Sequence, residues 1–171
     1  MRLRSLNHVN VLAELLMAET YDYKGVKVNL HKNRWHFCWD NRSIKRFGVS
    51  KPSIRVISLS RALCKANLEK GEDIKNVILH EIAHAVQFSA MGYSDHGREW
   101  SSFAQSIGCD GKQYYDSDDV NTPQSKYTLV CPCCGREVAK KSKPKRSVSC
   151  GKCGAPNRYD MKFKMELIQN Y

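Results

Sequence analysis

The spacing of apolar residues predicts one helix and then three strands in the first part of the chain. Over residues 10–20 the apolar positions recur at helical spacing, and Gly25 follows as a stop signal. Residues 34–41 (RWHFCWDN) and 53–60 (SIRVISLS) alternate apolar and polar side chains instead, which is typical of strands. The segment between them, residues 43–52 (SIKRFGVSKP), predicts a further strand. Three short consecutive strands favour an antiparallel sheet.

The alternation also predicts which faces of these strands are buried. The aromatic residues of the first strand share one face, and we expect core positions for its tryptophans, Trp35 and Trp39, and for Trp100. In the segment 53–60 the alternation sets two groups of residues on opposite faces. One group is Ile54, Val56 and Ser58, and the other is Arg55, Ile57 and Leu59.

From residue 71 to residue 92 (GEDIKNVILHEIAHAVQFSAMG) the period changes to that of a helix, with acidic residues in the first turn and Gly92 at the exit. A shorter helix is predicted over residues 97–106. Residues 109–126 are rich in polar and turn residues, which indicates a linker. We therefore expect a first domain over residues 1–119 and a second over residues 120–171. The mixture of helices and a small sheet places the first domain in the α+β class.

The long helix carries the motif H-E-x-x-H at residues 80–84. Residues i and i+4 lie on one helix face, so His80 and His84 can direct two ring nitrogens at a single ion. Glu81 lies beside them and can act as a general base toward water, as in zinc peptidases. Core histidines and a solvated helix carboxylate are the alternative reading. Burying these polar groups unpaired would cost several kcal/mol, however, and coordination removes that cost.

A catalytic zinc ion normally takes three protein ligands and leaves one position open. Metzincins would place the third histidine at residue 90, which is Ala90 here, so that subclass is excluded. We favour His96, because it precedes the next helix after a turn through Gly92 and can face back toward the motif. Glu99 is the competing ligand, since other zinc peptidases use a glutamate from a later helix.

Four of the eight cysteines form two C-x-x-C pairs. These are Cys131, Cys134, Cys150 and Cys153, and the spacing predicts a closed four-sulfur zinc site of structural type. Cys133 is an alternative to Cys134 in the first pair. The remaining cysteines, Cys38, Cys64 and Cys109, have no redox motif, and we expect buried free thiols. The other histidines, His8, His31 and His36, are interpreted as surface or packing residues.

Positive charge is concentrated in the second predicted domain. Residues 1–119 carry 17 Lys and Arg against 14 Asp and Glu, whereas residues 120–171 carry 11 against 3, a net charge of +8. A short loop holds much of this charge and predicts contacts to nucleic acid phosphates without sequence specificity, although a purely solubilising loop is the alternative. The loop residues are Arg136, Lys140, Lys141, Lys143, Lys145 and Arg146.

The N-terminal segment is basic and then apolar, like a signal peptide, but Asn10 and Glu14 interrupt its apolar run and no small-residue cleavage site follows. No stretch has the length of apolar residues that a membrane span requires. We therefore expect a cytoplasmic protein with no membrane partner.

The order of these motifs resembles the SprT-like zinc metalloproteases, which include the Spartan-type enzymes that degrade proteins crosslinked to DNA. The resemblance rests on WDNRSIKRFG, ISLSRAL, HEIAHA and DHGREW, followed by CPCCG and CGKCG. It implies a zincin-like fold, a zinc ion on His80, His84 and His96, and Glu81 as the catalytic residue. The short layout is more similar to microbial or viral members, which implies a nucleoid-associated location or, for a virus, the host cytoplasm.

Together, these features predict a zinc-dependent endopeptidase with one catalytic and one structural zinc ion. Its partners would be a protein substrate and DNA, the DNA being held by the basic ribbon. Two alternatives remain at this point. One is a DNA-binding or regulatory protein that uses the zincin domain as a scaffold, and the other is a zinc hydrolase acting on substrates other than peptides.

Overall fold

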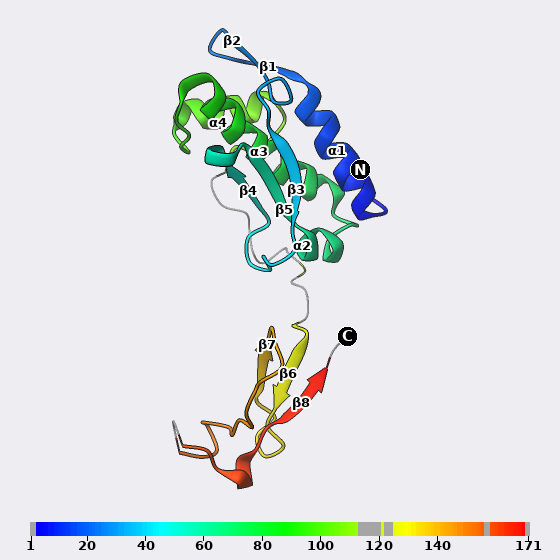
Figure 1. The fold of residues 1–171 in the computed structure, drawn as a ribbon, viewed down its shortest axis with the longest axis vertical. Coiled ribbons are helices and arrows are strands. Elements are labelled where there is room, and N and C mark those ends of the chain that lie inside the picture. The colour runs from blue at the N-terminus through cyan, green and yellow to red at the C-terminus, as the bar shows by residue number, and fades with distance from the viewer. Residues whose placement is uncertain (1–2, 113–120, 122–124, 156–157, 170–171) are drawn as a thin grey trace. The chain divides into compact units, whose positions relative to one another are not determined.

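The structure of the chain is a computed structural model that describes residues 3–112, 121, 125–155 and 158–169. It consists of two compact units, Met1–Pro123 and Gln124–Tyr171 (Figure 1). The predicted boundary between residues 119 and 120 lies outside the described residues. The elements of the first unit are α1 (Leu6–Ala18), β1 (Thr20–Tyr23), β2 (Val26–Asn29), β3 (His36–Asp40), β4 (Gly48–Lys51), η1 (Pro52–Ile54), β5 (Val56–Ser60), α2 (Arg61–Ala66), α3 (Gly71–Met91) and α4 (Arg98–Ser106).

The first helix begins before the predicted position because Ser5 caps it. The Ser5 hydroxyl accepts a hydrogen bond from the backbone amide of His8 (3.3 Å), which satisfies one of the free amides of the first turn. The helix ends at Ala18, and Gly25 is not its stop signal. Instead, Lys24 and Gly25, both with positive φ, form the turn of an antiparallel hairpin that joins β1 to β2.

The central sheet has the strand order β3-β5-β4, with β3 parallel to β5 and β4 antiparallel to β5. The prediction of a wholly antiparallel sheet is therefore wrong for the β3-β5 pair. After β3 the chain passes through residues 41–47 and returns as β4, and β5 then inserts between the two. A hydrogen bond from the Ser60 hydroxyl to the Ser43 carbonyl (2.6 Å) joins this crossing segment to the end of β5.

Strand β5 starts later than its alternation predicted. Residues 52–54 form the short helix η1, and Arg55 then has a left-handed backbone, with φ 52°. Ile54 is 62% exposed, whereas Ile57 and Leu59 are 0% exposed. The core face is therefore the one with Ile57 and Leu59. Ser58, on the opposite face, is also buried (1% exposed), and β3 and β4 pair with the two edges of the strand.

Helix α3 lies at the centre of the first unit, where it packs against β4, β5, α1 and α4 (Figure 1). It follows the prediction closely and ends at Gly92, whose left-handed conformation (φ 80°) closes the helix. Helix α4 also agrees with its prediction, whereas α2 was not predicted. The α+β class is confirmed. Among the described residues no helix combines the length and the apolar character needed to cross a membrane.

The second unit contains a three-stranded antiparallel sheet of order β7-β6-β8. Its elements are β6 (Tyr127–Val130), β7 (Glu137–Lys140), η3 (Met161–Phe163) and β8 (Glu166–Gln169). Its buried core is small and consists of Leu129, Met165 and two cysteines, Cys131 and Cys150. So little apolar material stabilises a fold of this size poorly, which favours a stabilising metal.

Candidate metal centre

Three histidine side chains converge between α3 and the segment before α4. The motif positions His80 and His84 on one face of α3, and the Nε2 atoms of these two residues are 3.2 Å apart. The Nε2 atom of His96 lies 2.9 Å from that of His84 and 3.3 Å from that of His80. A tetrahedral zinc ion with Zn–N bonds of about 2.0–2.1 Å separates its nitrogen ligands by about 3.3–3.4 Å. The cluster therefore has the size and the donor set of a zinc site.

Glu99, the competing third ligand, lies outside this cluster. Its carboxylate pairs with the Lys24 ammonium at the tip of the β1-β2 hairpin. The hairpin, which the sequence reading missed, thus gives Glu99 a partner away from the histidines.

Hydrogen bonds behind the histidines orient their rings. His84 donates from Nδ1 to the Ser94 hydroxyl (2.7 Å), which in turn donates to the Gln87 side-chain carbonyl (3.2 Å). The ring of His80 hydrogen-bonds to the Lys112 backbone. Such partners fix the tautomer that leaves Nε2 free to bind a metal.

Gln87 holds the loop that carries His96. It is 1% exposed, accepts a hydrogen bond from the Asp95 amide (3.0 Å) and donates to the Asp95 carboxylate (3.0 Å). The same carboxylate accepts from the Gly97 amide (3.1 Å). The loop between α3 and α4 is therefore tied to α3 at Asp95, whose carboxylate also holds the residue that follows His96. The sequence analysis did not identify Gln87. The available signal is that Gln87 lies three residues after His84, on the same face of the helix.

Burial keeps these imidazoles neutral. It lowers the pKa of His80 to about 4, with a further contribution from His96. It lowers the pKa of His84 to about 3, with contributions from His80 and His96, and it lowers the pKa of His96 as well. Neutral imidazole is the form that coordinates a metal, so at neutral pH the cluster does not have to lose protons first.

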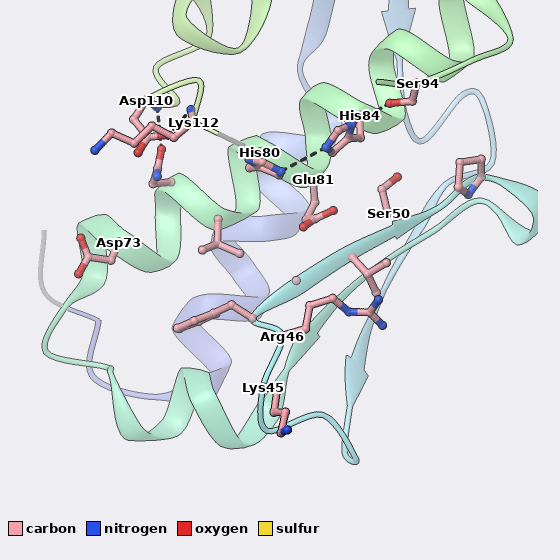
Figure 2. Close-up of a pocket in the computed structure, with 16 residues that line it drawn as sticks. Lys45, Arg46, Ser50, Asp73, His80, Glu81, His84, Ser94, Asp110 and Lys112 are labelled. Carbon is pink, nitrogen blue, oxygen red and sulfur yellow. Dashed lines mark hydrogen bonds between the residues drawn. The ribbon is translucent and has the colours of Figure 1, made fainter. Parts of the chain in front are cut away.

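Glu81 lies next to the histidines on α3, and its carboxyl points toward β4 (Figure 2). It is 7% exposed, and burial raises its pKa to about 7. Two groups oppose this rise: the Ser50 backbone amide, which hydrogen-bonds to the carboxyl, and the positive charge of Arg46. A carboxyl that changes protonation near neutral pH is suited to proton transfer.

The absence of a side chain at Gly48 lets β4 approach this carboxyl. A Cβ atom at residue 48 would lie 2.8 Å from both Cγ and Oε1 of Glu81 and 3.0 Å from Leu59. Any other residue here would displace Glu81 or β4. The sequence offers only a glycine within a strand pattern as a signal of this close approach.

A cleft of about 760 Å³ extends from the histidines along α3 (Figure 2). One side is formed by α3, and the opposite side by β4 and the residues before it. Its charged lining residues are Lys45, Arg46, Asp73, Asp110 and Lys112, in addition to Glu81. The cleft joins the candidate metal centre to the free edge of β4, since among the described residues β4 pairs only with β5.

The second unit brings four cysteines together. The Sγ atoms of Cys131 and Cys153 are 3.9 Å apart, and those of Cys134 and Cys150 are 3.7 Å apart. With Zn–S bonds of about 2.3 Å, tetrahedral zinc separates its sulfur ligands by about 3.8 Å. Cys133 is exposed and is not part of this cluster.

The two C-x-x-C-G segments fold alike. The Gly135 amide donates to the Cys131 carbonyl and the Gly154 amide to the Cys150 carbonyl, both at 2.9 Å. Backbone hydrogen bonds, first from Lys152 and also from Cys153, lower the pKa of Cys150, which favours the thiolate that binds zinc.

The basic loop residues lie on the surface of the second unit, except that Lys140 is half-buried in β7. Lys145 and Arg146 line a groove of about 730 Å³ together with Lys164, which the sequence reading did not include. Apolar residues such as Leu129 and Met165 also line it.

The remaining sequence predictions have mixed outcomes. Cys64 and Cys109 are buried thiols as predicted, whereas Cys38 is exposed, because β3 lies at an edge of its sheet and Cys38 points away from the core. His8, His31 and His36 lie on the surface, as predicted, and His31 pairs with Glu14 (3.0 Å). Trp35 and Trp100 are core residues, and Trp39 packs against the core.

Comparison with known proteins gives one match. Residues 16–121 match the SprT-like family. No curated protein and no solved structure shows a significant match to the chain. The family match covers more than half of the 171 residues and includes the three clustered histidines and Glu81. The chain therefore belongs to the SprT-like family.

Proposed function

We propose that the chain is a zinc-dependent endopeptidase that acts on proteins bound or crosslinked to DNA. The observation that carries this proposal is the convergence of three Nε2 atoms beside the buried carboxyl of Glu81. Membership of the SprT-like family supports the same activity. A bound zinc ion would supply Lewis acidity, which polarises a peptide carbonyl and makes water nucleophilic near neutral pH.

Glu81 is the general base in this proposal. Its raised pKa of about 7 lets the carboxylate take a proton from the attacking water and then return it to the leaving amine. The Ser50 amide and the charge of Arg46 keep part of the population ionised despite burial. Gly48 leaves room for the carboxyl between α3 and β4.

The free edge of β4 is the proposed binding site for the substrate backbone. The Ser50 amide points to Glu81 rather than to β5, so this edge of the strand faces the cleft. An extended peptide that pairs with β4 would pass directly in front of Glu81 and the histidines. Backbone pairing of this kind selects extended or unfolded polypeptide rather than a particular sequence.

The second unit is proposed to hold the enzyme on DNA through its basic loop and groove. Its net charge of +8 favours phosphate contacts, and Lys145, Arg146 and Lys164 gather at one groove. Binding to DNA would raise the local concentration of any protein attached to it. The choice of substrate would then depend on which proteins are attached to the DNA, and the cleft would bind mainly the substrate backbone.

Cleavage of a DNA-binding protein by the zinc-loaded full chain tests the activity, with and without DNA and with and without a chelator. We expect fragments that require both zinc and DNA, and none from Glu81→Gln. Glu14→Gln is the matched control, since it neutralises an exposed carboxylate that pairs with His31 and is not part of the cluster, and it should cleave like the wild type. Cleavage by Glu81→Gln at the wild-type rate would refute the role of Glu81. Binding of DNA without any cleavage would favour the scaffold alternative.

The salt dependence of DNA affinity tests the proposed contact. Each lost phosphate contact changes the slope of log K against log salt by about 0.9, so Lys145→Gln with Arg146→Gln should flatten it by about 2. Lys152→Gln with Lys162→Gln is the control pair, because it removes the same charge outside the groove. If both pairs of substitutions flatten the slope equally, the groove is not the DNA-binding site. A flat slope for the wild type would refute phosphate binding altogether.

A further inference from the structure

Trp100 touches every histidine of the candidate metal centre. It lies in the first turn of α4 and is 0% exposed. The centre of its indole ring is 4.8 Å from the ring centre of His80, 4.7 Å from that of His84 and 4.6 Å from that of His96. One aromatic ring is thus almost equidistant from all three candidate ligands.

The orientations of these contacts are the ones that aromatic pairs prefer. The indole stacks on His84 with an interplanar angle of 19°. It meets His80 and His96 edge to face, at 70° and 74°. Turning any one imidazole away from the common centre would break its contact with the indole. The position of Trp100 therefore restricts the side-chain rotamers of three residues at once.

His96 depends most on this contact. His84 and His80 each have a hydrogen-bond partner behind the ring, Ser94 and the Lys112 backbone. In the described part of the chain, the His96 ring has no hydrogen bond outside the cluster. The indole and the neighbouring imidazoles are what hold it in place.

The ring of Trp100, and not its N–H group, makes these contacts. Trp100 Nε1 is buried and has no hydrogen-bond acceptor among the described residues. Because this N–H group makes no hydrogen bond within the ranges that the structure describes, replacing tryptophan with phenylalanine removes no hydrogen bond there. Phenylalanine should therefore replace Trp100 better than an aliphatic residue of similar size.

We infer that Trp100 is a positioning residue whose ring holds the three imidazoles converged before the metal binds. The inference rests on the metal centre of the proposed function but not on peptide cleavage. Holding ligands in their bound arrangement strengthens binding, because less freedom is lost when the ion arrives. Loss of a residue that orients metal ligands typically weakens metal binding by about 10- to 100-fold.

Cobalt affinity of the full chain tests the inference in Trp100→Leu, Trp100→Phe and wild type. Cobalt on the histidines is followed by its weak visible bands, and thiolate charge-transfer bands report the four-cysteine cluster separately. We expect Trp100→Leu to bind cobalt about 10- to 100-fold more weakly at the histidine site, with unchanged affinity at the four cysteines. The cobalt affinity of Trp100→Phe should stay near that of the wild type. Wild-type affinity in Trp100→Leu, or an equal loss in Trp100→Phe, would overturn the inference.

Trp35→Phe is the matched control. Trp35 is 2% exposed, packs on Phe88 and donates to the Ser89 hydroxyl (2.9 Å), without contacting the histidines. Its loss should destabilise the fold and leave cobalt affinity unchanged. An equal loss of affinity in Trp35→Phe would mean that general destabilisation explains the effect, and would overturn the inference.

A fluorescence measurement keeps the inference refutable even if Trp100→Leu fails to fold, because it tests whether the metal binds beside the indole ring. In the variant with Trp35→Phe and Trp39→Phe, Trp100 is the only tryptophan, since the chain has three, and excitation at a wavelength that tyrosine does not absorb isolates its emission. Cobalt bound beside its ring should quench most of the emission. Unquenched emission at saturating cobalt would overturn the inference. Normal metal binding without peptide cleavage would refute the proposed activity and leave this inference intact.

Discussion

Replacing Glu81 with glutamine should stabilise the metal-free protein, by an amount that depends on pH. Burial raises the pKa of Glu81 from an ordinary 4.5 to about 7, so ionising this carboxyl in the folded state costs free energy. A shift of this size, at about 1.36 kcal/mol per pKa unit, corresponds to about 3 kcal/mol. Glutamine keeps the shape and the acceptor for the Ser50 amide but never ionises.

The variant is the more stable protein at neutral pH because the Glu81 carboxyl ionises at a lower pH in the unfolded state than in the folded state. Below pH 4.5 the carboxyl is neutral in the folded and unfolded states, and wild type and Glu81→Gln should be similar. Between pH 4.5 and about 7 the unfolded chain ionises first, so wild type loses stability relative to the variant as pH rises. Above about pH 7 the difference should be constant, at about 3 kcal/mol.

Urea unfolding of the metal-free full chain measures this difference. Tryptophan fluorescence reports the first unit alone, because all three tryptophans, Trp35, Trp39 and Trp100, lie there. The gap in unfolding free energy between variant and wild type should widen by about 2–3 kcal/mol from pH 5 to pH 8. Saturating zinc should narrow it, since a nearby cation stabilises the carboxylate. A gap that stays constant with pH would refute the reasoning.

Three further predictions concern other parts of the molecule. Gly48→Ala should destabilise the first unit by about 1–3 kcal/mol in urea unfolding, because the added methyl group clashes with Glu81. Gly151→Ala is the control and should have little effect, since there is open space around Gly151. Equal effects of the two substitutions would contradict the close approach of β4 to Glu81. Cys134→Ser should lose the zinc of the second unit by elemental analysis while Cys133→Ser keeps it, and the reverse outcome would assign Cys133 as the ligand in place of Cys134. In the Glu81→Gln background, the unfolding free energy of the metal-free protein, measured in urea, should fall as pH falls from 6.5 toward 4. The reason is that His80 and His84 stay neutral in the folded state but gain protons in the unfolded state. An unfolding free energy that rises on acidification would contradict the burial of these two histidines.

The sequence predicted the elements whose pattern is local. Helix α3 could be located from its period, and the H-E-x-x-H motif places His80, Glu81 and His84 on it without further information. The paired C-x-x-C spacing likewise predicts four cysteines that the fold brings together. In both cases the chemistry depends on residues a few positions apart.

The features that escaped the sequence depend on contacts between distant segments. Alternation identifies the faces of a strand but not its neighbours, so it did not reveal that β5 lies between β3 and β4. The approach of Gly48 to Glu81 and the contacts of Trp100 with His80 and His84 join residues far apart in the chain. A glycine in a strand and an aromatic residue in a helix are too common to single out such positions.

Zinc content after dialysis against a competing chelator tests the central claim most directly. The account predicts two zinc ions per chain in the wild type and in Glu99→Ala, and one in His96→Ala, because His96 and not Glu99 lies in the histidine cluster. Two ions in His96→Ala together with one in Glu99→Ala would contradict the three-histidine centre on which the proposed activity depends.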